Sequence, residues 1–186
     1  MFPHWNYVIE GIIGTIKTVY SQTATHIPER VDEKGNTYAC TADDAAYAIF
    51  QVETPSGDQV IVELNSSWNV RVHRKELVEF AVEGTQGSAV AGLRLCETQS
   101  RAETPTPTWN PDLPDANDYL SQWTDVSDTS LQNGFKLQWE EFLADVVAGR
   151  KHRYDLLSGA RGVQLAELGL QSSEEGRRLN VPEITL

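Results

Sequence analysis

The sequence has few cysteines, a shortage of basic residues and no long apolar run, and each shortage excludes a class of protein. It holds 2 cysteines in 186 residues. Cys40 and Cys96 have neither metal-ligand nor CxxC spacing, so we expect reduced thiols and no disulfide framework. The 15 basic residues stand against 27 acidic ones, for a net charge of −12, which argues against binding to a phosphate backbone. No stretch is apolar enough to cross a bilayer and no signal-peptide pattern opens the chain. We therefore expect a cytoplasmic protein that binds neither nucleic acid nor membrane.

What the sequence does contain is the composition of a folded domain. The hydrophobic fraction is 40% and the charged fraction 23%, which fits a single globular domain over residues 1–186. Residues 45–53 and 59–68 each alternate apolar and polar positions, and Pro55 and Gly57 lie in the short loop between them. Two period-2 runs joined by such a loop predict a β-hairpin with one buried face.

The remaining periodic segments predict strands first and helices last. Trp5, Ile9 and Ile12 recur at helical spacing up to Gly14. The other expected strands are residues 15–27, 76–83 and 89–97, with a loop over 28–41. A helix is expected from Leu131 to Gly149, with an apolar face formed by Phe135, Trp139, Phe142 and Val146. A second helix is expected from Asp155 to about Leu170, with inward side chains at Leu157, Ala160, Val163 and Leu168. This order predicts an α+β fold: an open, largely antiparallel mixed β-sheet with helices packed on one face.

Residues 98–129 interrupt this pattern. They contain Pro105, Pro107 and several aspartates, together with Trp109 and Trp123. A Pro/Asp-rich loop of this length inside a compact domain is typically functional or partly disordered. The tryptophans indicate that it packs on something, either as a lid over a cleft or against a neighbouring subunit.

Three segments together resemble the C-terminal domain of the Gfo/Idh/MocA family of NAD(P)-dependent oxidoreductases. The first is MFPHW, where His4 falls at the histidine of the family's Asp-x-x-x-His pattern. The second is DDAAYAIFQVETPSG with VELNSSW, followed by the Gly-Thr-x-Gly turn in VEFAVEGTQGS. The third is the closing stretch from LQWEEF to LNVP. The resemblance covers nearly the whole chain outside residues 98–129.

The family's nucleotide-binding motifs are not found in this sequence. It has no GxGxxG and no Glu-Lys-Pro, so the resemblance implies that NAD or NADP is bound mainly by a domain absent here and that this chain alone does not transfer hydride. It also implies a sugar, inositol or related polyol as substrate.

The resemblance assigns candidate roles to a few residues. His4 is the candidate catalytic acid or base, because alcohol oxidation moves a proton and histidine titrates in the right range. Trp5, Asn6 and Tyr7 follow it and are candidate substrate contacts, although core packing explains Trp5 as well. Lys136 and Gln138 match a helix that lies near the substrate cleft in similar enzymes.

The uncovered sheet face is the candidate subunit interface. Tyr47 and Ile49 on one strand and Ile61 and Glu63 on the next form a mixed apolar and polar surface, and the family uses this face to build homodimers or tetramers. No metal site is expected, because the histidines have no ligand partners at suitable spacing.

Two other functions stay open. The chain could be a stand-alone, non-catalytic module that dimerises or binds a ligand with the same fold. It could also be a small sugar binder that uses Trp68, Trp109 and Trp123 as its platform.

Overall fold

The computed structural model describes residues 2–114 and 116–184, and the chain divides into two compact units. Unit 1 comprises Met1–Val70 and Phe142–Leu186, and unit 2 comprises Arg71–Glu141. Met1 of the MFPHW motif, Asp115 of the long loop and the last two residues lie outside the described residues, as does the side chain of Phe2.

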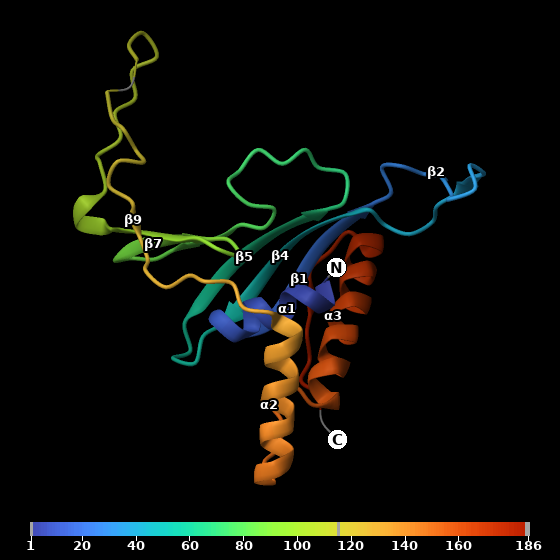
Figure 1. Cartoon of the computed structure of the whole chain (residues 1–186). Coiled ribbons are helices and arrows are strands. Elements are labelled where there is room, and N and C mark those ends of the chain that lie inside the picture. The colour runs from blue at the N-terminus through green and yellow to red at the C-terminus, as the bar shows by residue number, and fades with distance from the viewer. Residues whose placement is uncertain (1, 115, 185–186) are drawn as a thin grey trace. The chain divides into compact units, whose positions relative to one another are not determined.

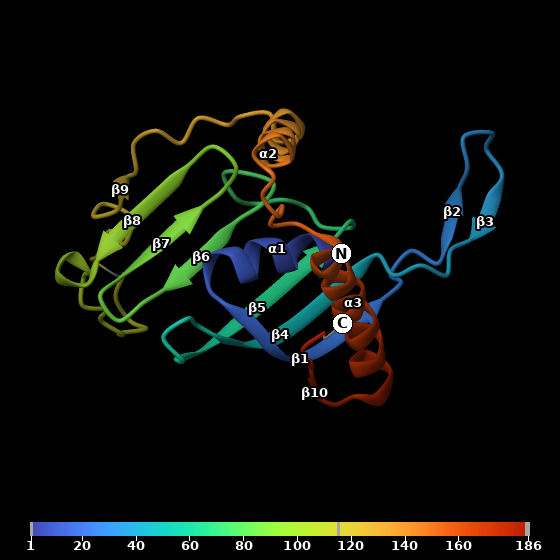
Figure 2. The ribbon, with the colours of Figure 1, turned by 90° about the horizontal axis from the view of Figure 1, so that it is seen from below.

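Unit 1 contains a four-stranded antiparallel sheet and two helices that pack on one face of it. The sheet has the strand order β10-β1-β4-β5. The elements of unit 1 are α1 (Phe2–Ile12), β1 (Thr15–Ala24), β2 (Glu29–Val31), β3 (Thr37–Ala39), β4 (Ala45–Glu53), β5 (Gln59–Ser67), α3 (Leu156–Glu175) and β10 (Leu179–Asn180). Figures 1 and 2 show α1 and α3 against this sheet. The predicted β4–β5 hairpin is confirmed, with Phe50 opposite Val62 and Ile49 opposite Glu63.

The core of unit 1 lies between the sheet and these two helices. Ile9 of α1 and Leu165 of α3 meet Val19, Phe50 and Val52 of the sheet, and all five are buried. The alternation read from the sequence therefore puts even-numbered β4 residues inward, as a half-covered antiparallel sheet requires.

Helix α3 also completes the edge of β1. Only Thr18 and Val19 of β1 pair with β10. Beyond them the backbone N–H of Ser21 donates to Ser172 Oγ at 3.0 Å and that of Thr23 donates to Ser173 Oγ at 2.9 Å. Two serine hydroxyls of a helix thus replace a neighbouring strand and satisfy buried backbone donors.

Unit 2 contains a second four-stranded antiparallel sheet, with the order β6-β7-β8-β9. Its elements are β6 (Phe80–Glu83), β7 (Gly87–Ala91), β8 (Cys96–Ser100), a 3₁₀ turn (Arg101–Glu103) and β9 (Thr124–Asp125). Helix α2 (Gly134–Ala148) runs along the chain from unit 2 into unit 1. The predicted α+β class with open antiparallel sheets is confirmed.

Several boundaries differ from the prediction. The single strand expected over 89–97 is two strands, because the N–H of Gly92 donates to the Leu95 carbonyl and closes a turn. The loop expected over 28–41 contains the β2–β3 hairpin, and the segment 98–129 contains the end of β8 as well as β9.

The predicted helices are present, but their apolar faces are not as expected. The stripe Phe135, Trp139, Phe142 and Val146 of α2 is exposed, and the buried residue of that helix is Asp145. In α3, Leu165 is buried, while Ala160 and Val163, both expected to point inward, are exposed. Periodicity located the helices; it could not show which side a neighbouring element covers.

No helix among the described residues is long and apolar enough to cross a membrane.

Candidate functional site

His4 lies in the first turn of α1 with its side chain exposed. The helix is fixed over the sheet by buried Ile9 and by Trp5, whose Nε1 donates to Ser66 Oγ at 3.2 Å. Its C-terminal end is fixed by Gly14, which has a φ of +150° and where a Cβ would lie 2.1 Å from the Glu53 carbonyl oxygen. Only glycine fits this close, left-handed connection, so α1 holds His4 on a rigid element.

The two residues after His4 have different surroundings. Trp5 is half-buried and packs against the core as well as bonding Ser66. The side chain of Asn6 is 3% exposed, and its Oδ1 has no hydrogen-bond partner among the described residues. The structure thus gives Trp5 a packing role. The substrate contacts predicted for Trp5 and Asn6 remain predictions.

The connection between α2 and α3 is held by one carboxylate, Asp145. Helix α2 ends in a Schellman motif: Gly149 has a φ of 63°, and the N–H of Arg150 donates to the Asp145 carbonyl at 2.9 Å. The Asp145 side chain then accepts from Arg150 Nε and Nη2 at 3.0 and 2.9 Å and pairs with His152 Nδ1 at 3.0 Å. The hydrogen bond with His152 and that with Arg150 lower the pKa of Asp145 below its ordinary value. We call the Asp145, Arg150 and His152 group the latch.

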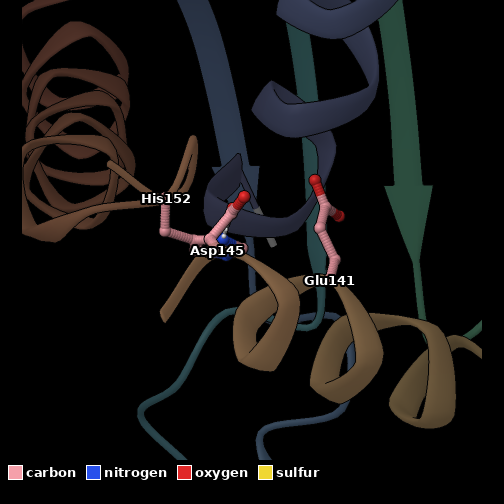
Figure 3. A group of neighbouring side chains, drawn as sticks. All are labelled: Glu141, Asp145 and His152. Atoms are coloured by element: carbon pink, nitrogen blue, oxygen red, sulfur yellow. Dashed lines mark hydrogen bonds and ion pairs between the residues drawn. The ribbon is translucent and has the colours of Figure 1, made fainter. Parts of the chain in front are cut away.

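Figure 3 shows Asp145 and His152 side by side, with Glu141 one turn earlier on α2. Two carboxylates and an imidazole are ligand types that divalent metals use. Both Asp145 oxygens already have partners, however, one of them a guanidinium. A metal ion would have to displace these contacts, and this favours a structural role for the latch.

A series of ring contacts connects His152 of the latch with helix α1. His152 meets the Phe142 ring edge-on at 5.5 Å and the Tyr154 ring at 5.9 Å. Tyr154 in turn meets Tyr7 of α1 at 5.4 Å between ring centroids, nearly perpendicular. Tyr7 is three residues after His4, and therefore on a neighbouring position of the same helix face.

Sequence reasoning missed Tyr154 and the latch, whereas Tyr7 was among the candidate substrate contacts that follow His4. The local signal was available only in part: Gly149 was predicted to end α2 and Asp155 to begin α3, and Asp155 does accept from the Ser158 N–H at 3.0 Å. Lys151 and that N–H lower the pKa of Asp155 to about 2. The ring contact between Tyr7 and Tyr154 joins residues far apart in the chain, and no local pattern predicts such a pair.

A partly buried ion pair lies beside Tyr7. Arg161 of α3 donates from Nη2 to Glu10 Oε1 at 3.1 Å and to the Ile16 carbonyl, and from Nη1 to the Pro182 carbonyl at 3.1 Å. Glu10 Oε1 also accepts the N–H of Ile16 at 3.0 Å. The pair thereby joins α1, β1, α3 and the segment after β10.

Lys136 and Gln138 lie in the exposed first half of α2, in unit 2. Lys136 pairs with Glu140 one turn later, at 3.5 Å. Nothing in the structure tests their predicted role near a substrate.

The face of the unit 1 sheet opposite the helices is open. Tyr47, Ile49, Ile61 and Glu63 all lie on it and are exposed, Ile61 to 67%. Tyr20 of β1 lies opposite Ile49 and extends the same surface. An exposed patch of aromatic and aliphatic side chains with polar neighbours is typical of an interaction surface.

No family model matches the chain. It is 65% identical over 187 aligned residues to a D-xylose dehydrogenase of Paenarthrobacter nicotinovorans, and the alignment covers 100% of this chain but 48% of that protein. Among solved structures it resembles a levoglucosan dehydrogenase in complex with NADH (TM-score 0.73, 15% identity, 99% of this chain and 50% of that chain). It also resembles an oxidoreductase domain protein from Kribbella flavida (TM-score 0.63, 17% identity, 97% of this chain and 48% of that chain).

The fold is thus one that forms about half of an oxidoreductase chain, and the present chain spans about half the length of the relatives it matches. The likeness to solved structures establishes the fold, and the identity to the dehydrogenase establishes the relationship. The chain is therefore similar over its whole length to about half of a dehydrogenase, and the resemblance to the C-terminal domain of the Gfo/Idh/MocA family that its motifs indicated is confirmed.

Proposed function

We propose that this chain is the substrate-binding and oligomerisation domain of an NAD(P)-dependent oxidoreductase that acts on a sugar or a related polyol. The observation that carries the proposal is the 65% identity to a D-xylose dehydrogenase over the whole length of the chain. The exposed position of His4 at the start of α1 supports it. A cytoplasmic location stays part of the same proposal.

The chemical role of this domain would be to bind the sugar and to move a proton. Oxidation of a sugar alcohol releases the hydroxyl proton, and the His4 imidazole can accept it because histidine titrates near neutral pH. The dinucleotide, when bound, supplies hydride transfer. This chain has no GxGxxG motif, so we assign none of its residues to the dinucleotide.

The experiment is a chimera in which this chain replaces the 187 aligned residues of the Paenarthrobacter enzyme. We expect His4→Asn to lower kcat by about 10²–10⁴-fold, the usual contribution of a general base. The matched control is His26→Asn, because His26 is also exposed and lies at the base of the β2–β3 hairpin. Equal kcat values for the two variants would contradict the role of His4.

We propose further that the open sheet face makes a homodimer, or a dimer within a tetramer. Ile61 is 67% exposed and projects from this face beside Gln51. Exposure of this apolar side chain to water is unfavourable, and a partner subunit that covers it would remove that cost. Ile61→Asp together with Ile49→Asp should yield monomers in sedimentation equilibrium. Val31→Asp is the control, because Val31 is 66% exposed but lies on the hairpin. Dimers that persist in the double variant would contradict the assignment of this sheet face as the dimer interface.

The second candidate is a stand-alone, non-catalytic module with the same fold. It predicts a chain that dimerises and binds a sugar, while the chimera stays inactive although folded. The two candidates therefore differ in one observable, turnover by the chimera.

A further inference from the structure

Unit 1 contains a hollow of about 600 Å³ between α1, the start of α3 and the segment after β10. Tyr7 and Gly11 line it from α1, Tyr154 and Ser158 from the start of α3, and Glu183 from the last segment. Its volume lies in the range of small-molecule sites, about 300–1,000 Å³. Tyr7 and Gly11 are three and seven residues after His4, so the hollow opens beside the helix face that carries His4.

The wall of this hollow nearest to His4 is aromatic. Tyr7 is 37% and Tyr154 47% exposed, although their rings meet edge-to-face. The guanidinium carbon of Arg153 lies 4.6 Å from the centre of the Tyr154 ring. Rings that are fixed by each other yet partly uncovered offer an apolar surface with a hydroxyl at its edge. A sugar has matching surfaces, since its C–H groups gather on one face and its hydroxyls project around the ring.

The floor of the hollow is polar. Glu10 and Arg161 form the ion pair described above, and Asn6 contributes the buried Oδ1 that has no partner among the described residues. A buried amide oxygen without a donor lowers stability. This oxygen is closed off from solvent, so the polar contacts that the hollow offers to a hydroxylated ligand come from Glu10 and Arg161.

We infer that this hollow is where the domain holds its sugar or polyol, with Tyr7 and Tyr154 as the contacting wall. The inference rests on the proposed function and deepens it by naming the residues that touch the substrate. Asp145 and His152 then act as positioning residues, because the latch fixes the connection that carries Tyr154.

Gly11 offers a sharp test of the hollow, because it lines the hollow without a side chain. A Cβ added at Gly11 would have no atom within 4 Å, and leucine has a higher helix propensity than glycine. Gly11→Leu should therefore fold well and fill the hollow. Tyr154→Ala removes the aromatic wall, and Tyr38→Ala is its control, because Tyr38 is likewise 47% exposed but lies in β3.

The first measurement uses the chain itself. D-xylose is titrated into it while the tyrosine ring resonances are followed by NMR. We expect saturable shifts at Tyr7 and Tyr154 but not at Tyr38, and we expect Gly11→Leu to abolish them. Saturable shifts confined to other rings, or no shifts up to the solubility limit of the sugar, would overturn the inference.

The second measurement uses the active chimera. Gly11→Leu and Tyr154→Ala should each raise the KM for D-xylose by about tenfold or more, the size expected when a close contact with substrate is lost. His4→Asn should lower kcat instead. If the chimera is active and both hollow variants keep the parent KM, the hollow is not the sugar site, while the proposed function stands. If the unsubstituted chimera is folded but inactive, the proposed function fails, and the NMR titration alone decides whether the hollow binds sugar.

Discussion

The two units of the chain have sheets of equal strand number and very different cores. Unit 1 buries ten hydrophobic side chains in one cluster between its sheet and the helices α1 and α3. In unit 2 the only buried residue among those described is polar, Gln99, and the side chains of β6 and β7 are exposed or half-buried. Hydrophobic burial is the main stabilising term in folding. Strand pairing is therefore enough to form a sheet, whereas a buried hydrophobic core forms where helices pack on one face of that sheet.

The largest loss in the free energy of unfolding should follow from substitutions at the closest backbone contacts of the two units. Gly14→Ala in unit 1 combines a φ of +150° with a Cβ 2.1 Å from the Glu53 carbonyl, and should destabilise the chain by about 2–5 kcal/mol. Gly87→Ala in unit 2 brings a Cβ to 2.6 Å from the Gln99 carbonyl at an ordinary φ, and should cost about 1–3 kcal/mol. Urea unfolding monitored by circular dichroism measures both.

The control for these variants is Gly159→Ala. Gly159 lies in α3 with nothing within 4 Å of an added Cβ, so alanine should stabilise the chain by about 0.5–1 kcal/mol. Equal losses for Gly14→Ala and Gly159→Ala would contradict the tight α1–β1 connection.

A matched pair of valines measures the cores directly. Val52 of β4 is 0% exposed and Val82 of β6 is 44% exposed. We expect Val52→Ala to cost about 2–3 kcal/mol, the lost transfer free energy plus a cavity. Val82→Ala should cost about 0.5 kcal/mol or less. A similar cost at both positions would show that unit 2 has a buried core of its own.

Amide hydrogen exchange sharpens the same comparison without a mutation. The amides of the central strands β1 and β4 should be the most protected of the chain, because both strands have neighbours along their two edges and helices cover one face of the sheet. The amides of β7 should exchange faster, through local opening. Equal protection in β4 and β7 would argue that the two units unfold together.

The smallest effect concerns the base of the β2–β3 hairpin. Asp44 is buried, which by itself would raise its pKa, but the N–H groups of His26 and Ile27 donate to its two oxygens at 2.9 Å and lower the pKa to about 2. The ionised carboxylate therefore stabilises the hairpin fully above the ordinary pKa of 3.8, and this stabilisation is lost as the pH falls towards 2.

Carboxyl chemical shifts against pH measure this titration, with Asp44→Asn as the variant in which it disappears. Amide exchange in β2 and β3 should rise over the same pH interval relative to β4. A carboxyl that titrates near pH 4 with unchanged hairpin protection would refute the account of Asp44.

The sequence predicted the elements that local patterns determine. Alternation located β4 and β5, apolar spacing located α1, and cap residues located Gly149 and Asp155 at the ends of α2 and α3. It failed where the answer depends on what packs from elsewhere. The apolar stripe of α2 gave no sign that Asp145 is the buried residue, and the run 89–97 gave no sign of the turn at Gly92.

The candidate site shows the same limit. A family motif pointed to His4, and Tyr7 follows it on the same helix. The partner of Tyr7, Tyr154, comes from the other end of the chain. Tyr154 reaches Tyr7 only because α3 packs on the sheet beside α1 and because the latch fixes the preceding residues. Such contacts follow from tertiary structure and have no signature in either segment.

Turnover of D-xylose by the unsubstituted chimera is the decisive measurement for our proposal that this domain supplies the sugar-binding half of a dehydrogenase. Reduction of NAD or NADP is followed by absorbance, with the parent Paenarthrobacter enzyme measured beside it. We expect turnover within about tenfold of the parent, since the exchanged domains are 65% identical. A chimera that folds and binds the dinucleotide, yet reduces neither NAD nor NADP with D-xylose or any other sugar, would contradict it.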